Sequence, residues 1–218
     1  MLIGTTSYAL ANVINKTIEQ GIPPKAILSF NAEPLLLVIL NSILIDNNSL
    51  NYHQCPKKIF AKVINSLTSI GPQHIPYIFC HGLLPVKDST HSFSTSVDKL
   101  VFLEEEYIQL SNSAFSWQAA TFLNICLSQH IIFIGTSLTD ANMRRWLSWV
   151  NSNRLNELRQ NGVNTNVSTQ HYWIRTTPHD KTAVPWIEAT VSHLGIRIIW
   201  IDSWDKVDTA LEKILGIS

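Results

Sequence analysis

The stretch HIIFIGTS, residues 130–137, decides the fold that we expect for this chain. Its apolar run is typical of a strand that is buried on both faces of a parallel sheet. The run breaks at Gly135, and the segment after it predicts a helix from Asp140 to Val150. A strand followed directly by a helix is the repeating unit of α/β proteins.

The same alternation extends along the chain in both directions. Apolar residues at helical spacing from Leu10 to Ile18 predict a helix, and Gly21 is a typical end signal. The segment 59–70 fits either a helix or a strand. The remaining expected strands are 26–30, 76–80, 172–174 and 196–201. The remaining expected helices are 34–44, 104–110, 115–129 and 204–215. We expect polar loops at 46–58 and 85–98, and a polar, exposed segment at 154–169. We therefore expect an α/β fold, a parallel sheet with helices on both faces, in one domain over residues 1–218.

Composition narrows the class of protein. The 218 residues include 16 basic and 16 acidic side chains, so no charge excess points to nucleic acid or an anionic membrane. Three cysteines, Cys55, Cys80 and Cys126, form no C-x-x-C motif, and an odd number favours a reducing cytoplasm over a disulfide framework. The longest apolar run, 35–40, is far shorter than a membrane span. We expect a cytoplasmic protein with no membrane segment and no direct nucleic-acid contact.

Three of the expected strands end in polar or flexible residues, and ligands of open parallel sheets bind beyond such ends. The Asn31 amide can donate and accept a hydrogen bond at once, or it can cap the next helix. His81, which precedes Gly82, could act as a general base, or its ring could bond to the backbone. The decision between these alternatives needs the structure.

The third strand end is Gly135-Thr136-Ser137. Backbone N–H groups and two hydroxyls at such a turn suit phosphate or ribose oxygens, although a plain strand-to-helix turn has the same sequence pattern. Asp140 is expected to cap the following helix. The chain has no G-x-G-x-x-G, P-loop or G-x-S-x-G motif. His53, Cys55, Cys80 and His81 match no common zinc spacing, so we expect no metal.

These strand ends, in this order, resemble the sirtuin-like family, and most of all the bacterial sirtuin-like NAD hydrolases of antiphage defence. Four motifs carry the resemblance: SFNAEPLL at 29–36, the His81-Gly82 pair, EEEY at 104–107, and GTSLTDAN at 135–142. The similarity extends from about Ser7 to the carboxyl end. Motifs of this kind are hypotheses until structural context supports them.

The resemblance implies a Rossmann-like fold that binds NAD and cleaves the bond between nicotinamide and ribose. It implies that Asn31 positions a water or the ribose and that His81 acts as the base. Fixed polar groups would stabilise an oxocarbenium-like transition state. The cofactor-binding residues that it implies are Glu33, Gly135, Thr136 and Ser137.

The chain also departs from the family pattern. The family's glycine-rich loop, Gly-Ala-Gly-x-Ser, has only a poor counterpart at residues 3–6, so we expect the amino-terminal strand to be missing. The cysteine pairs of deacetylating sirtuins are absent. Three functions therefore stay open: a NAD glycohydrolase, a non-catalytic nucleotide-sensing module, and a structural module of a larger assembly. The expected partners are NAD, together with a second copy or a partner protein of a defence system.

Overall fold

The computed structural model describes residues 5–47, 59–65, 70–84, 116–165 and 169–217. The chain divides into two compact units: Met1–Gln109 with Val207–Ser218, and Leu110–Lys206. The structure defines each unit by itself, so the single domain expected over 1–218 stays a prediction.

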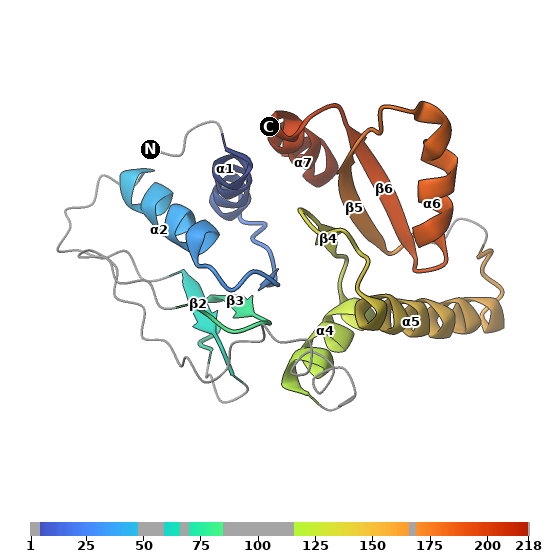
Figure 1. The fold of residues 1–218 in the computed structure, drawn as a ribbon. Helices are drawn as coiled ribbons and strands as arrows, with labels where there is room; N and C mark the ends of the chain where they lie inside the picture. The colour runs from blue at the N-terminus through green and yellow to red at the C-terminus, as the bar shows by residue number, and fades with distance from the viewer. Residues whose placement is uncertain (1–4, 48–58, 66–69, 85–115, 166–168, 218) are drawn as a thin grey trace. The chain divides into compact units, whose positions relative to one another are not determined.

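The first unit contains a small parallel sheet with the strand order β1-β3-β2 (Figure 1). In its register Ser29 pairs with Phe79, and Val63 pairs with Ile78. The elements are α1 (Thr6–Glu19), β1 (Ile27–Ser29), α2 (Leu35–Asn47), β2 (Phe60–Val63), β3 (Ile75–Phe79) and α7 (Val207–Leu215). Pairing with β3 makes the ambiguous segment 59–70 a strand over residues 60–63.

Helix α1 begins earlier than its apolar pattern predicts because Thr5 caps it. The Thr5 hydroxyl accepts a hydrogen bond from the Tyr8 N–H at 3.3 Å, which satisfies one of the donors that the first turn leaves unpaired. The apolar side of α1 packs with α2 and the sheet. The buried core of this unit comprises Ala11, Leu37, Ile39, Leu40, Ile43, Phe60, Ile75, Tyr77, Phe79 and Leu83.

The second unit has its own parallel sheet, with the strand order β4-β5-β6. Its elements are α4 (Trp117–Ser128), β4 (Ile132–Phe133), α5 (Ala141–Gln160), β5 (His171–Thr176), η2 (Lys181–Ala183), α6 (Val184–Ser192), β6 (Ile196–Ile201) and η3 (Trp204–Lys206). The short helix pair η2 and α6 was not expected from the sequence. Pro185 lies in the first turn of α6, where proline favours the start of a helix, and apolar spacing alone did not indicate this helix.

Strand β4 is shorter than the apolar run that predicts it. The Ile131 N–H donates to Nδ1 of the His171 side chain at 3.2 Å, and His130 Nδ1 bonds the Gln170 carbonyl at 2.7 Å. The two histidine rings thus occupy the Ile131 N–H and the Gln170 carbonyl, which would otherwise bond to each other and pair β4 with β5. At its other end Gly135 adopts a φ of 67°, which ends the extended backbone.

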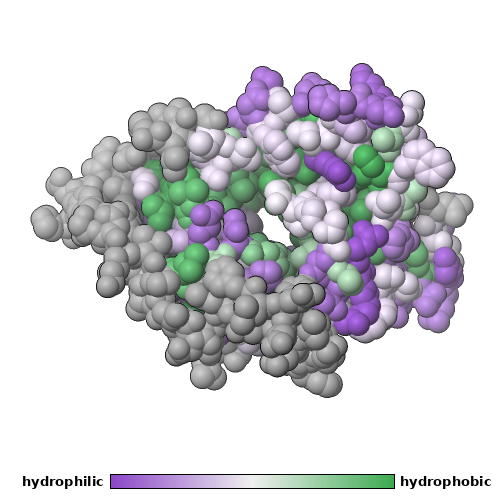
Figure 2. Space-filling model, in the orientation of Figure 1, coloured by the Kyte–Doolittle hydropathy of each residue, from purple (hydrophilic) through white to green (hydrophobic). Residues whose placement is uncertain are grey.

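Helix α5 is longer than expected. It continues through Gln160 into the polar segment expected to be exposed, and Gly162, with a φ of 71°, follows its end. Its buried residues, Met143, Leu147, Val150 and Asn151, all lie in the first three turns. The rest is hydrophilic, as the purple side chains along α5 in Figure 2 show. The expectation of a polar, exposed segment is therefore confirmed for 154–160, and the structure adds that these residues are helical.

The α/β fold class is confirmed, with parallel sheets and helices on both sides. One detail is corrected. The strands that precede Asn31 and His81 share a sheet, whereas β4 belongs to the second sheet. The expected helix 104–110 lies outside the described residues. Within the described part of the chain no helix is long and apolar enough to cross a membrane.

Candidate functional site

Asn31 and His81 follow neighbouring parallel strands at the same edge of the first sheet. Ser29 and Phe79 are register partners, and each site residue lies two positions beyond its partner. The Cys80 N–H donates to the Ser29 carbonyl at 2.9 Å. Further on, the Leu84 N–H donates to the Ala32 carbonyl at 2.8 Å. The two segments therefore continue side by side past the ends of their strands.

The backbone of Asn31 is fixed while its side chain is exposed. The Ser29 hydroxyl donates to the Asn31 carbonyl at 2.9 Å and accepts from the Asn31 N–H at 3.2 Å. The Asn31 amide lies 3.5 Å from a Glu33 carboxylate oxygen, a long contact that a ligand can displace. Helix α2 begins at Leu35, so Asn31 precedes the N-cap position and is not its N-cap.

His81 is half-buried, and an aromatic neighbour holds its ring. The rings of His81 and Phe30 meet edge to face, with centroids 5.5 Å apart. The next residue, Gly82, has a φ of 83°, and its N–H donates to the Phe79 carbonyl at 3.3 Å. The turn needs glycine at this position, because a side chain would strain a left-handed backbone. The His81-Gly82 pair is thus a strand-end turn that presents an imidazole.

Two buried groups below this edge stay protonated at neutral pH. Burial raises the pKa of Tyr77 to about 12; the Ser29 hydroxyl opposes this shift and the Glu33 charge adds to it. Burial also raises the pKa of Cys80 to about 12. A thiol is nucleophilic only as the thiolate, so Cys80 is a packing residue rather than a nucleophile.

The turn after β4 is held by side chains from elsewhere in the second unit. The Trp173 indole N–H donates to the Thr136 carbonyl at 3.0 Å. Arg144 donates to the Leu138 carbonyl at 3.2 Å. Leu138 has a φ of 52° and a buried side chain. A leucine rarely adopts this conformation, so packing and these two hydrogen bonds must hold it there.

The outer part of this turn faces solvent. The Ser137 and Thr139 hydroxyls, on exposed residues, lie 2.7 Å apart. No described atom lies within 4 Å of the place where a Cβ on Gly135 would stand, so a ligand can approach the backbone there. Asp140 accepts from the Met143 N–H at 2.7 Å and caps α5, which confirms its predicted role.

The structure brings together Asn31, Glu33 and His81, and it places Gly135, Thr136 and Ser137 in the second unit. Sequence reasoning gave no role to Phe30, Arg144 or Trp173 as supports for these turns. No local pattern could have assigned Trp173 to Thr136, because the two are 37 residues apart.

Among the residues that the structure describes, no group of three or more His, Cys, Asp or Glu could hold a metal ion. His53, Cys55 and residues 104–107 lie outside the described residues. Within the described chain Cys80 and Cys126 are free and buried.

The model of the SIR2-like domain family matches residues 46–198, well over half of the 218 residues. The chain belongs to the SIR2-like domain family. The match includes His81 and the 135–137 turn, whereas Asn31 and Glu33 precede it. It supports the sirtuin-like resemblance over this narrower range, and with it a sirtuin-type, NAD-binding function. No curated protein matches the chain.

Proposed function

We propose that this SIR2-like chain is a NAD glycohydrolase, which cleaves the bond between nicotinamide and ribose. One observation carries the proposal: Asn31 and His81 follow neighbouring parallel strands at one sheet edge. An exposed amide and a half-buried imidazole at such an edge are the groups that can orient and deprotonate a water.

The chemistry follows from the charges. When the C–N bond breaks, nicotinamide leaves with the electron pair and becomes neutral, and positive charge spreads over the ribose. The exposed Glu33 carboxylate beside Asn31 would stabilise that charge. Asn31 would hold the attacking water, whose oxygen bonds to the ribose carbon. His81 would accept the proton, and the products are nicotinamide and ADP-ribose.

We assign the turn after β4 to the adenosine half of NAD. Gly135 has an open approach to its backbone, and the Ser137 hydroxyl is exposed. Ribose hydroxyls and phosphate oxygens are suitable partners for such groups. The rigid backbone from Thr136 to Leu138 would present them without a large ordering cost on binding.

The biological setting that we propose is bacterial antiphage defence, in which NAD depletion would stop the host and the virus together. It rests on the motifs at 29–36, 81–82 and 135–142. A second function has its own support. Residues 3–6 are only a poor counterpart of the glycine-rich loop, which favours a nucleotide-sensing module without catalysis.

The test is to incubate the purified chain with NAD and to measure free nicotinamide and ADP-ribose by chromatography. Wild type should release both in equal amounts without an acetylated peptide. Asn31→Ala should lower the rate by about a hundredfold, the usual scale for a positioned polar group. Asn153→Ala, at an exposed position on α5, is the matched control and should keep the wild-type rate.

Other outcomes discriminate between the functions. NAD binding in calorimetry without nicotinamide release would favour the nucleotide-sensing module. Release that needs an acetylated peptide would indicate a deacylase and contradict the proposal. The absence of both binding and release would leave only the structural module.

A further inference from the structure

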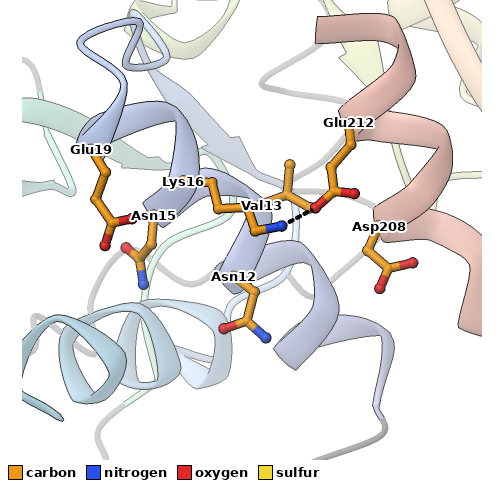
Figure 3. A pocket seen from close by; sticks show the side chains of 7 residues that line it. All are labelled: Asn12, Val13, Asn15, Lys16, Glu19, Asp208 and Glu212. Carbon is orange, nitrogen blue, oxygen red and sulfur yellow. Dashed lines mark hydrogen bonds and ion pairs between the residues drawn. The ribbon is translucent and has the colours of Figure 1, made fainter. Parts of the chain in front are cut away.

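A polar pocket of about 270 Å³ lies between helices α1 and α7 of the first unit (Figure 3). Asn12, Asn15, Lys16 and Glu19 line it from α1, and Asp208 and Glu212 line it from α7. All six residues lie outside the 46–198 match to the SIR2-like family. None of the six has a role in the proposed NAD chemistry.

Asn15 is the first sign that the pocket is a binding site. The residue is 2% exposed, and within the described part of the chain neither its amide nitrogen nor its amide oxygen has a hydrogen-bond partner. A buried unpaired amide lowers the stability of a fold. A ligand that offers both a donor and an acceptor would satisfy both atoms.

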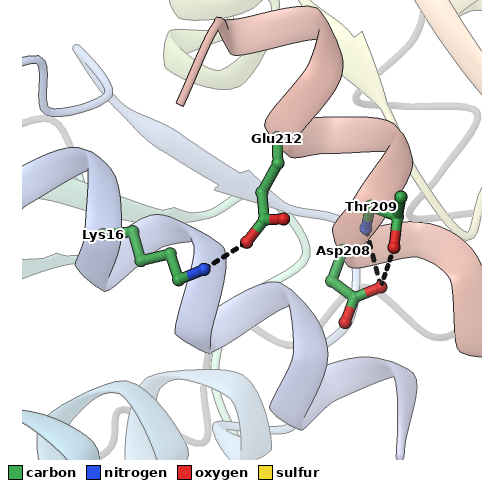
Figure 4. Close-up of polar contacts among 4 residues, drawn as sticks. All are labelled: Lys16, Asp208, Thr209 and Glu212. Carbon is green, nitrogen blue, oxygen red and sulfur yellow. Dashed lines mark hydrogen bonds and ion pairs between the residues drawn. The ribbon is translucent and has the colours of Figure 1, made fainter. Parts of the chain in front are cut away.

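The charges in the pocket are the second sign. The Lys16 ammonium pairs with the Glu212 carboxylate at 2.5 Å (Figure 4). The hydrogen bond and charge of Glu212 raise the pKa of Lys16, and the charges of Asp208 and Glu19 add to the shift, so all three carboxylates lie near one ammonium. Three acids against one base leave an excess of two negative charges among the lining residues.

The arrangement of the helices gives the pocket two ends. Figure 3 shows Asp208 across from Asn12, one helical turn away from the bridge between Lys16 and Glu212. One oxygen of Asp208 accepts from the Thr209 N–H at 2.7 Å, within α7. The carboxylates can hold a positive charge, while Asn12 and Asn15 can hold an uncharged polar group.

We propose that this α1–α7 pocket binds a small organic cation that also carries an amide or hydroxyl group. The cation balances the acidic residues, and the uncharged polar group pairs with the Asn15 amide. The volume is near the lower limit of roughly 300 Å³ for small-molecule sites, which fits a compact metabolite rather than a polymer. Lys16 on α1 and Glu212 on α7 are 196 positions apart in the sequence. A ligand bound between the two helices would therefore also stabilise the packing of two distant parts of the chain.

The experiment uses the full chain with Nα-acetyl-L-argininamide as the probe and Nα-acetyl-L-citrullinamide, in which an uncharged urea replaces the guanidinium, as its counterpart. Calorimetry should show saturable one-to-one binding of argininamide, at least tenfold tighter than that of citrullinamide. A saturating excess of NAD should leave this affinity unchanged, which separates the pocket from the proposed NAD site. No saturable binding of argininamide to wild type, or equal binding of both probes, would overturn the proposal.

Two variants and one control locate the site. Asn15→Leu should weaken argininamide binding at least tenfold, yet keep or raise the melting temperature of the free protein, because leucine leaves no unpaired polar atom. Asp208→Asn should weaken argininamide binding severalfold. If Asn15→Leu does not fold, Asp208→Asn alone tests whether the pocket is the binding site. Asp205→Asn, at an exposed position outside the pocket, should bind like wild type. Wild-type affinity in both pocket variants would contradict the assignment.

Discussion

The polar edge after β1 and β3 and the turn after β4 are both strand ends, yet they are built differently. At the first edge Asn31 and Glu33 are exposed and share only a 3.5 Å contact. In the second, Trp173 and Arg144 bond the backbone on either side of a buried Leu138. The edge after β1 and β3 presents side chains that can move to contact a ligand. The turn after β4 presents a backbone that is held in a fixed position.

The two units also use histidine differently. His81 is half-buried at a carboxyl edge, where a substrate could reach it. His171 is 1% exposed, and its Nδ1 accepts the Ile131 N–H. The first is suited to chemistry and the second to packing. Substitution of His81 should therefore alter activity, and substitution of His171 should alter stability.

The largest effect is expected from His81→Ala. Loss of a general base should lower the rate of nicotinamide release by about 10²–10⁴-fold, while the circular dichroism spectrum and melting temperature stay near those of wild type. The exposed His179 supplies the control, and His179→Ala should retain full activity. A wild-type rate in His81→Ala would remove this edge from the mechanism.

Leu138→Ala should be the most destabilising change in the second turn. It removes a buried side chain, for which losses of about 2–5 kcal/mol are usual, and alanine at a φ of 52° keeps the backbone strain. Urea unfolding measures the loss. The neighbouring exposed Thr139→Ala should change the free energy of unfolding by about 0.5 kcal/mol or less. Equal effects of both variants would mean that the turn is not held by packing.

Acid should weaken the second unit through His171. Burial lowers its pKa to about 4 from the ordinary histidine value of 6.5, and the positive charges of His130 and Arg154 add to the shift. Between these values the unfolded chain binds more protons than the folded one. Stability is therefore fully present above pH 6.5 and is lost as pH falls toward 4, by about 3 kcal/mol at most.

Denaturant titrations between pH 7 and pH 4 test this dependence. His171→Asn is the informative variant, because its amide oxygen can replace Nδ1 as the acceptor and does not titrate. Its unfolding free energy should vary less with pH over this window. An unchanged pH slope in this variant would show that other groups cause the loss.

Ser137→Ala should have the smallest effect and should appear in binding alone. The exposed Ser137 hydroxyl bonds the Thr139 hydroxyl within the turn, so the free energy of unfolding should change by about 0.5 kcal/mol or less. If Ser137 contacts NAD as proposed, KM for NAD should rise severalfold with kcat nearly unchanged, since a uniform binding contact is lost. A fall in kcat with constant KM would place Ser137 in the chemical step instead.

The sequence located most elements because their signals are local. Strand β6 was predicted with its observed limits, and β1, β3 and β5 were predicted within a few residues. The errors arose where distant residues intervene. The His171 ring takes the Ile131 N–H and shortens β4, and α5 continues past its apolar stripe because capping and helix propensity suffice there.

The candidate site was predictable to the same extent. Strand ends suggested Asn31 and His81, whose roles stay predictions; the family match includes His81 and begins after Asn31. The α1–α7 pocket was not found, although Asn12, Lys16 and Glu19 recur at helical spacing on one face of α1. A polar helix face is ordinarily solvated, and the acidic residues that make it a pocket come from the other end of the chain.

The sequence by itself thus determined the α/β class, the neutral charge, the turn residues and the polar groups that end each strand, because each depends on neighbours a few positions apart. Only the tertiary structure decided that Asn31 and His81 meet at one edge, that Trp173 and Arg144 fix the second turn, and that Asn15 is buried in a pocket that three carboxylates also line. These facts depend on strand register and helix packing, which join residues far apart in the chain and leave no local pattern.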